Sequence, residues 1–314
     1  METGSIPATR FRHEALFYAG DDRLLAGTLP FIRDGLRAGE PVMVALDQRK
    51  IDLLRAQLGG EGDRVHFAEM HELGQNPARI IPAWAEFVAD HAEPAHLRGI
   101  GEPIWPGRGP AELVECQHHE SLLNLAFDGG RSWTLLCPYD ALGLSRDVLE
   151  GARHTHPVVS DQGLEAQSDT YRDPRAAHAP FSGPLTPIPA AARWITVGEG
   201  GLYDLRRFVG DHARRAGLDV TGTENIVMAA NELIANSIRH GGGTGELAVW
   251  STGESVLCEV RDAGHILDPL VGRERPTAGQ IGGYGLWTTN HLCDLVQIRS
   301  TASGTAVRVH VRIR

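Results

Sequence analysis

The sequence predicts two α/β domains with different sheets, joined by a linker. Apolar runs alternate with helical patterns over residues 11–160, and a stretch rich in Pro, Ser, Asp and Ala without a sustained period covers 161–190. The segment 191–314 ends in a strand of regular apolar–polar alternation. Alternating strands and helices favour a mainly parallel sheet, whereas a strand with one apolar face favours an antiparallel one.

Buried strands that alternate with helices are expected in the first segment. The expected strands are EALFYAG, PVMVALD, VHFAEM, LRGIGEP and SWTLLCPYD, and the expected helices are LLAGTLPFIRDGLRAG, QRKIDLLRAQLG, ARIIPAWAEFVADH and AELVECQHHESLLNLAF. The first strand–helix step has a RecA-like layout, but its loop holds Asp21 and Asp22 and lacks GK[ST]. Such a loop would repel a triphosphate, so we expect a RecA-like scaffold without a P-loop that serves in sensing or interaction.

Composition narrows the functional classes. The net charge of −10 argues against nucleic-acid binding, and Lys50 as the single lysine excludes kinases whose lysine contacts the phosphates. No apolar run reaches the ~18 residues of a membrane span, and the N-terminus lacks the apolar core of a signal peptide. The four cysteines are scattered without a CxxC motif. We therefore expect a cytoplasmic protein that binds neither nucleic acid nor a membrane.

Two histidine-containing motifs of the first segment could supply metal ligands. They are CQHHE at 116–120 and HTH at 154–156. Cys116 with His119 or Glu120 has the i, i+3 or i+4 spacing that metal sites use. A third and a fourth ligand cannot be placed, so we expect ordinary surface histidines on a helix. A weaker alternative makes this segment an enzyme with its site at Asp21–Asp22 or at CQHHE.

The stretch NELIANSIRHGGG, residues 231–243, is the most informative part of the second segment. It belongs to a helix that we expect to begin with a capping box at Thr221–Glu224. With 3.6 residues per turn, one face of this helix is apolar and consists of Ile226, Val227, Ala230, Leu233, Ile234 and Ile238. The opposite face carries Glu232, Asn236 and His240 one turn apart, without the Lys–Glu pairs of an ordinary solvated face.

Two glycine-containing motifs follow this helix among the expected strands ELAVWST, SVLCEVRD, DLVQIRS and TAVRVHVRIR. In RDAGHILDP a strand ends in D-x-G, where an Asp can accept a hydrogen bond from an adenine amino group. In IGGYGLW glycines open a helix, whose backbone N–H groups can surround an anion. The last strand alternates Val and Ile with Arg and His, which predicts one solvent-facing side.

Both segments resemble known families. Residues 11–160 resemble the MEDS family of sensory domains in HEALFYAGDD, GLRAGEPVMVAL, GIGEPIWPGRGPAELVECQHHESLLNLAF and RHTHPVV. The segment 191–314 resembles the N, G1 and G2 boxes of the histidine-kinase-like ATPase superfamily, whose fold is the Bergerat α/β sandwich. LYDLRRFV, NELIANSIRH, RDAGHILDP and GGYGL look most like its anti-sigma factor and serine-kinase branch.

The second resemblance implies a role for each matched position. Glu232 would be the general base, Asn236 would coordinate Mg²⁺ and His240 would contact the phosphates of ATP. Asp262 would bind the adenine amino group, and residues 265–281 would form the ATP lid. Further nucleotide contacts are implied for Gly264, Gly283, Gly285, Leu286 and Thr305.

Together the resemblances imply a regulator that binds a sigma factor. It would use MgATP to phosphorylate a serine of an anti-anti-sigma protein of the STAS type, under control of a small molecule bound by the first domain. A homodimer is one assembly that the branch allows. An alternative is an inactive binding module with a decayed ATP site, because His265 and Ile266 follow Gly264 where the superfamily favours D-x-G-x-G.

Overall fold

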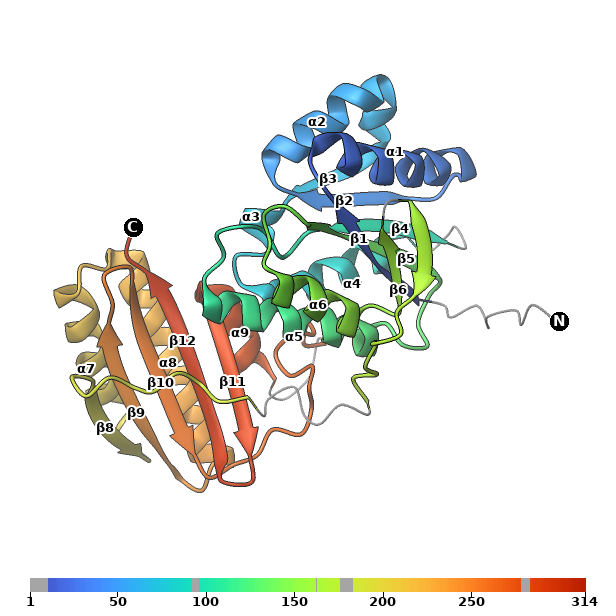
Figure 1. Cartoon of the computed structure of the whole chain (residues 1–314). Coiled ribbons are helices and arrows are strands. Elements are labelled where there is room, and N and C mark those ends of the chain that lie inside the picture. Colours follow the sequence, from blue (N-terminus) through green and yellow to red (C-terminus); the bar gives the residue numbers. More distant parts are fainter. Residues whose placement is uncertain (1–10, 92–95, 162, 176–182, 278–282) are drawn as a thin grey trace. The chain divides into compact units, whose positions relative to one another are not determined.

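The computed structural model (Figure 1) describes residues 11–91, 96–161, 163–175, 183–277 and 283–314. The chain divides into an N-terminal unit, Met1–Ala177, and a C-terminal unit, His178–Arg314. The division falls within the stretch that the sequence predicts as a linker. Among the described residues, no helix combines the length and the apolar character that a membrane crossing requires.

The N-terminal unit consists of alternating strands and helices. They are β1 (Phe11–Tyr18), α1 (Asp21–Ala38), β2 (Val42–Leu46), α2 (Gln48–Leu58), the 3₁₀ turn η1 (Gly59–Arg64), β3 (Val65–Glu69), α3 (Met70–Leu73), the 3₁₀ turn η2 (Pro77–Arg79), α4 (Ile80–Asp90), β4 (Leu97–Gly101), α5 (Pro110–Ala126), β5 (Trp133–Asp140), α6 (Arg146–Thr155), β6 (Val158–Asp161) and β7 (Leu164–Gln167).

The sheet of this unit has the order β3-β2-β4-β5-β1-β6-β7, and its neighbours are parallel except for β6 and β7. The chain moves to one side of β1 through β2 and β3, and then returns through β4, β5 and β6. Right-handed crossovers that reverse direction place their helices on opposite faces. Figure 1 accordingly shows α1 and α2 on one face of the sheet and α4, α5 and α6 on the other. The mainly parallel sheet expected from the sequence is confirmed.

The edge of this sheet differs from the expectation. The sequence predicts SWTLLCPYD as the last strand, yet β6 pairs with β1, and β7 lies within the predicted linker. All four residues of β7 are exposed, so no apolar pattern marks it. Its position is set by backbone pairing with β6, which a hydrophobic period cannot reveal.

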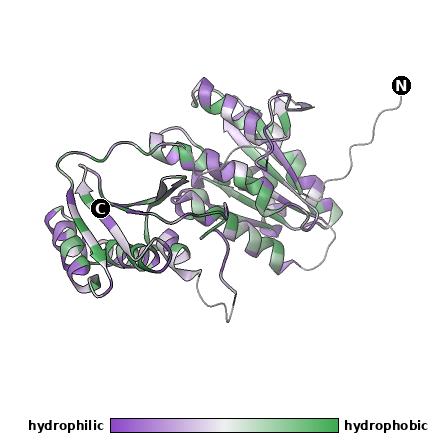
Figure 2. Cartoon of the chain, turned by 90° about the horizontal axis from the view of Figure 1, so that it is seen from below, coloured by the Kyte–Doolittle hydropathy of each residue, from purple (hydrophilic) through white to green (hydrophobic). Residues whose placement is uncertain are grey.

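The C-terminal unit is an antiparallel sheet with helices on one face. Its elements are β8 (Arg193–Gly198), α7 (Leu202–Arg215), α8 (Val220–His240), β9 (Thr244–Ser251), β10 (Ser255–Asp262), α9 (Tyr284–Leu292), β11 (Leu295–Thr301) and β12 (Gly304–Arg312). The strand order is β11-β12-β10-β9-β8. In Figure 2 green and purple stretches alternate along the helices of this unit, so each helix carries both apolar and polar residues. The apolar face predicted for α8 packs into this core, with Ile226, Ala230, Leu233 and Ile234 buried.

Two local predictions for this unit are wrong. Helix α8 begins at Val220, because the Asp219 side chain accepts a hydrogen bond from the Gly222 N–H at 2.6 Å and caps the helix in place of Thr221.

The face of β12 predicted to meet solvent is partly covered, since Arg308 is only 2% exposed. Its guanidinium donates to Glu259 Oε2 at 2.7 Å and to the Thr186 hydroxyl and carbonyl at 2.6 Å each. A segment before β8 therefore covers this part of the sheet.

Candidate functional site

A cavity of about 310 Å³ lies in the C-terminal unit between α8, the end of β10 and the start of α9. Every predicted nucleotide contact lines it, namely Asn236, His240, Asp262, Gly264, Gly283, Gly285, Leu286 and Thr305. Apolar side chains form much of the remaining wall, among them Leu233, Val260, Ile266, Val271 and Val307. A largely apolar cavity with a few convergent polar groups is the usual form of a small-molecule site.

Helix α8 contributes one edge of this cavity. Asn236 and His240 line it one turn apart, and Glu232 lies a further turn toward the helix N-terminus. Glu232 itself is not among the lining residues, but it lies beside Gly285 in the first turn of α9. A Cβ atom on Gly285 would lie 3.0 Å from Asn236 Nδ2 and 3.2 Å from Glu232 Oε2. Glycine at this position therefore lets α9 approach the polar face of α8 closely.

The Asp262 carboxylate is held at both oxygens. Ser237 donates to Oδ2 at 2.6 Å, and the Gly264 N–H donates to Oδ1 at 2.8 Å. Ser237 is 1% exposed and lies on the apolar face of α8. The sequence reasoning missed this residue, although a serine that interrupts an apolar stripe beside Asn236 was the available signal. An ionised carboxylate accepts about four hydrogen bonds, so Asp262 retains acceptor capacity for a ligand.

The base of the cavity is a small hydroxyl network. The antiparallel register of β10 and β12 pairs Asp262 with Thr305. The Thr305 hydroxyl donates to the Gly264 carbonyl at 2.8 Å and lies 3.0 Å from the Ser300 hydroxyl. Ser300 in turn accepts from the Ile266 N–H at 2.9 Å. These bonds hold the D-x-G turn against β11 and β12, and the sequence reasoning missed Ser300.

The opposite end of the cavity is the N-terminus of α9. Gly283 caps this helix with φ of 86°, a left-handed conformation that favours glycine. The unpaired N–H groups of a first helical turn attract anions.

The predicted lid, 265–281, is described only as far as residue 277. Within that part the Asp268 side chain accepts from the Leu270 N–H at 2.9 Å, and Asn290 donates to the Gly272 carbonyl at 2.8 Å.

The N-terminal unit has a cavity of its own, of about 570 Å³. Residues of β1, α1 and the β6–β7 region line it, including Glu14, Tyr18, Arg23, Phe31 and Glu165. Asp21 and Asp22, considered above as an alternative site, instead open α1, and Asp21 pairs with Arg49 at 2.8 Å. Among the described residues of this unit, this cavity has room for a small molecule.

A buried charged network lies at the carboxyl ends of β1, β2 and β4. The Lys50 ammonium lies 2.6 Å from Glu102 and 2.9 Å from Asp47, and the Tyr18 hydroxyl donates to Glu102 at 2.8 Å. Burial raises the pKa of Glu102 to about 7, although Lys50 and Tyr18 oppose the shift. Burial would lower the pKa of Lys50, but the charges of Glu102 and Asp47 outweigh it and raise that pKa.

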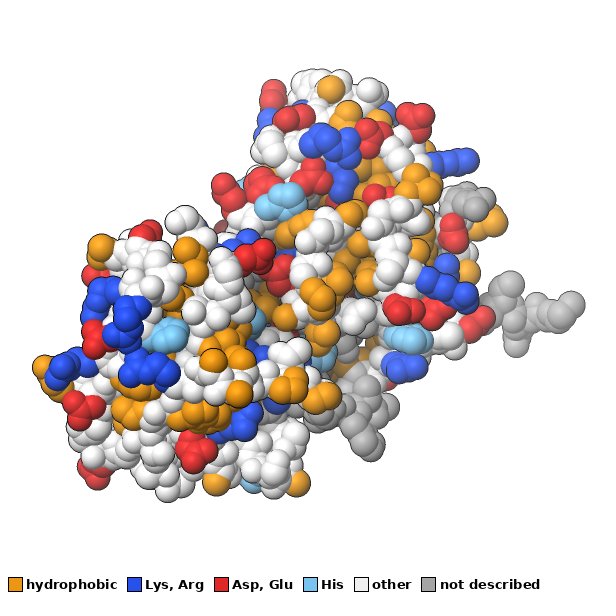
Figure 3. Space-filling model, turned by 60° about the vertical axis from the view of Figure 1, so that its left-hand side comes forward, with side chains coloured by type: hydrophobic (Ala, Val, Ile, Leu, Met, Phe, Trp, Pro, Cys, Tyr) orange, Lys and Arg blue, Asp and Glu red, His pale blue; other side chains and the backbone are white. Residues whose placement is uncertain are grey.

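Charged side chains of both signs lie on the surface. On the face shown in Figure 3, several basic side chains gather toward the lower left, with acidic and apolar side chains among and around them. The expectation that the chain does not bind nucleic acid continues to rest on its net charge of −10.

Comparisons with known proteins agree with both resemblances at the level of domains. Residues 12–157 match the MEDS family, described as the methanogen/methylotroph, DcmR sensory domain, and residues 199–311 match the histidine kinase-like ATPase domain. No curated protein matches the chain. A crystal structure of the RsbU and RsbW domains of a Mycobacterium tuberculosis protein is similar at 21% identity and a TM-score of 0.29. That match covers 40% of this chain and 33% of the other, so the chain spans about a third of its length.

Proposed function

We propose that this chain, which joins a MEDS domain to a histidine kinase-like ATPase domain, is an ATP-dependent protein serine kinase of a partner-switching system. The observation that carries the proposal is the convergence of three separate motifs on one cavity. The polar face of α8, the Asp262 carboxylate and the N-terminus of α9 all border the same space of about 310 Å³. Each motif suits a different part of ATP.

The Asp262 end of the cavity suits adenine. Ser237 and the Gly264 N–H orient the carboxylate and leave acceptor capacity for the amino group of the base. The apolar walls suit the ring, and Gly264 leaves the backbone open beside it. A Cβ atom on Gly264 would lie 2.7 Å from the His240 carbonyl, so a larger residue would force α8 and this turn apart.

The other end of the cavity suits the phosphates. The N–H groups at the start of α9 would bind phosphate oxygens, with His240 as a further contact. Asn236 offers a hard carbonyl oxygen of the kind that Mg²⁺ prefers, so the residues present fit this ion. Bound there, Mg²⁺ would neutralise charge on the phosphates. The cofactors we propose are therefore ATP and Mg²⁺.

Glu232 is the residue we assign to the chemistry. Its carboxylate lies beside Gly285, at the phosphate end of the cavity. It would accept the proton of a partner serine while the serine oxygen bonds to the γ-phosphorus and the bond to ADP breaks. The products are ADP and a phosphoserine, with the proton on Glu232.

The partners follow from the anti-sigma resemblance. The ATPase domain would bind a sigma factor and phosphorylate a STAS-type anti-anti-sigma protein, while a small molecule in the N-terminal cavity would tune the outcome. A protein with this activity would act in the cytoplasm. A second candidate function, a binding module without catalysis, is favoured by Ile266, which stands where the superfamily favours a second glycine.

Phosphate transfer to the host's STAS-type protein tests the kinase proposal. With MgATP, the full chain should add one phosphate to a serine of that protein, as detected by intact mass. Glu232→Gln should bind ATP normally and transfer nothing, whereas Glu224→Gln, on the exposed first turns of the same helix, should transfer normally. ATP binding without any mass shift in the partner would sink the kinase activity and leave the binding module.

A further inference from the structure

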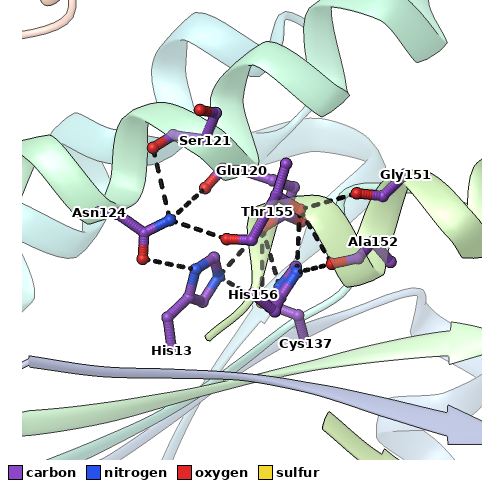
Figure 4. Close-up of polar contacts among 9 residues, drawn as sticks. All are labelled: His13, Glu120, Ser121, Asn124, Cys137, Gly151, Ala152, Thr155 and His156. Atoms are coloured by element: carbon purple, nitrogen blue, oxygen red, sulfur yellow. Dashed lines mark hydrogen bonds and ion pairs between the residues drawn. The ribbon is translucent and has the colours of Figure 1, made fainter. Parts of the chain in front are cut away.

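Four side chains capable of binding a metal meet inside the N-terminal unit (Figure 4). They come from four places in the chain, namely His13 on β1, Glu120 on α5, Cys137 on β5 and His156 directly after α6. Each is at most 1% exposed. The cluster lies on the face of the sheet that α5 and α6 cover, apart from the cavity between β1 and α1.

Four of the six distances among the ligand atoms are close to those of a tetrahedral coordination shell. His13 Nε2 lies 3.1 Å from Glu120 Oε2 and 3.4 Å from Cys137 Sγ. Glu120 Oε2 lies 3.4 Å from His156 Nε2 and 3.7 Å from Cys137 Sγ. All four ligand atoms lie within 4.8 Å of one another. Tetrahedral zinc with bonds of about 2.0–2.3 Å separates its ligands by roughly 3.3–3.7 Å.

The hydrogen bonds around the cluster set both histidines in the tautomer that ligates through Nε2. Asn124 donates from Nδ2 to the Thr155 carbonyl at 2.8 Å, so its Oδ1 faces His13 and accepts from Nδ1 at 3.3 Å. His156 Nδ1 lies 2.8 Å from the Ala152 carbonyl, which can only accept. Each Nδ1 therefore carries the proton, and each Nε2 presents a lone pair. Histidines that bind metals hold their other ring nitrogen in this way.

This arrangement leaves the centre of the cluster short of a positive charge. Two lone pairs of His13 and His156 face an oxygen of a fully buried carboxylate. Among the described residues, His156 Nε2 and Glu120 Oε1 have no hydrogen-bond partner. Buried polar atoms are normally paired, and a buried charge is normally compensated. A cation between these atoms would satisfy both requirements.

We propose that His13, Glu120, Cys137 and His156 bind one Zn²⁺ ion. Two imidazoles, a thiolate and a carboxylate are ligands that zinc accepts, while the nitrogen and sulfur donors disfavour Mg²⁺ and Ca²⁺. The thiolate and the carboxylate together balance the charge of a divalent ion, so the complete site is neutral in its buried position. The ion connects two strands of the sheet to α5 and to the end of α6.

A nucleophilic site built on Cys137 fits the same residues less well. Such a site needs room for a substrate, but Cys137 is 1% exposed. The cavity that borders Glu120 and Cys137, in the described part of the unit, is too small to hold a water molecule. A single ion needs no such room. The site is therefore suited to an ion that stays bound and stabilises the unit.

The expectation of ordinary surface histidines is wrong, because His119 and His156 are 1% and 0% exposed. Of the CQHHE motif, only Glu120 belongs to the cluster of four side chains. The Cys116 thiol instead donates to the Pro103 carbonyl at 3.4 Å. HTH contributes His156 alone. The missing third and fourth ligands are His13 and Cys137, which lie 124 residues apart in the chain and become neighbours only through the pairing of β1 with β5.

Metal content and cobalt absorption test the proposal on the full chain. After treatment with a chelator, incubation with Zn²⁺ and dialysis, the protein should retain one zinc per chain by mass spectrometry. Cobalt in place of zinc should give a thiolate-to-cobalt charge-transfer band. Cys137→Ala should lose the band and the zinc, whereas Cys116→Ala, which removes a buried thiol outside the cluster, should keep both.

A further variant covers the case in which Cys137→Ala does not fold. Asn124→Ala keeps all four ligands but frees the His13 ring, and it should weaken zinc binding about 10- to 100-fold. Circular dichroism establishes that each variant is folded. The proposal is overturned if the unaltered chain retains no zinc or shows no thiolate–cobalt band, or if folded Cys137→Ala keeps both, or if Asn124→Ala binds zinc as tightly as the unaltered chain.

Discussion

The Asp262 carboxylate is oriented before any ligand arrives. Its two hydrogen bonds, from Ser237 and from the Gly264 N–H, come from α8 and from its own turn. Asp262 lines the cavity, and in the proposed site its remaining acceptor capacity would bind the amino group of adenine. Guanine has a carbonyl oxygen at the corresponding position, which a carboxylate repels. Selection between the two purines is therefore expected to rest on this single residue.

Substitution of Asp262 tests this view of base selection. Asp262→Asn should weaken ATP binding by about 1.5–3 kcal/mol, or roughly 10- to 150-fold, because a charged acceptor is lost. It should also narrow the difference between ATP and GTP. Asp268→Asn, at another acid that lines the cavity, should change neither, because Asn supports the same turn. Fluorescence titration with both nucleotides measures the effect, and equal losses in the two variants would contradict it.

Among individual residues, the sequence predicts the candidates that belong to a local motif. Glu232, Asn236 and His240 follow from helical spacing, and Asp262 and Gly264 follow from a strand that ends in D-x-G. Ser237 and Ser300 were missed, because each acts through a partner distant in the chain. Their hydroxyls resemble those of any buried serine until the fold brings Asp262 and Ile266 beside them.

The helices and strands of the N-terminal unit bring together a buried ion pair that no local sequence pattern predicts. Lys50 lies on α2, while Glu102 follows β4, and the Tyr18 hydroxyl at the end of β1 completes the network. The sequence showed that Lys50 is the single lysine but not that it is buried. Periodicity predicted the apolar runs of this parallel sheet well, because both faces are covered, whereas it could not predict which charged ends of the strands meet.

Removal of Lys50 should destabilise this unit in a way that depends on pH. Lys50→Met leaves the Glu102 carboxylate buried without its cation, which costs about 3–5 kcal/mol. Because burial already raises the pKa of Glu102 to about 7, protonation favours the folded state. In the unaltered chain, stability from the protonated form is complete below the unfolded pKa and is lost as the pH rises through about 7, so only above that pH does the ionised Glu102 depend on Lys50. The penalty should therefore be large at pH 8 and small at pH 5.

Denaturant titrations of the full chain at the two pH values measure this difference. Arg49→Met, which removes the exposed neighbouring cation paired with Asp21, should cost no more than about 0.5 kcal/mol at either pH. The double variant Lys50→Met/Glu102→Leu should recover part of the loss and show little dependence on pH. A penalty for Lys50→Met that is the same at pH 5 and pH 8 would show that Glu102 does not titrate as described.

For the whole molecule, the chain combines a unit that matches the MEDS family with a unit that matches the histidine kinase-like ATPase domain, each with its own core and cavity. The mainly parallel and the antiparallel sheet were predictable from the sequence, since each has its own hydrophobic pattern. The strand β7 and the segment that covers Arg308 were not, because backbone pairing and a single buried guanidinium hold them in place. The zinc cluster likewise depends on strand order, which the spacing of its ligands does not reveal.

Isothermal titration calorimetry of the full chain with MgATP tests the central claim most directly. We expect one nucleotide per chain, bound with measurable heat and lost or strongly weakened in Asp262→Asn. The claim of an ATP site between α8, β10 and α9 requires this result whether or not phosphate is transferred. A folded, unaltered chain that shows no saturable binding of MgATP would contradict it.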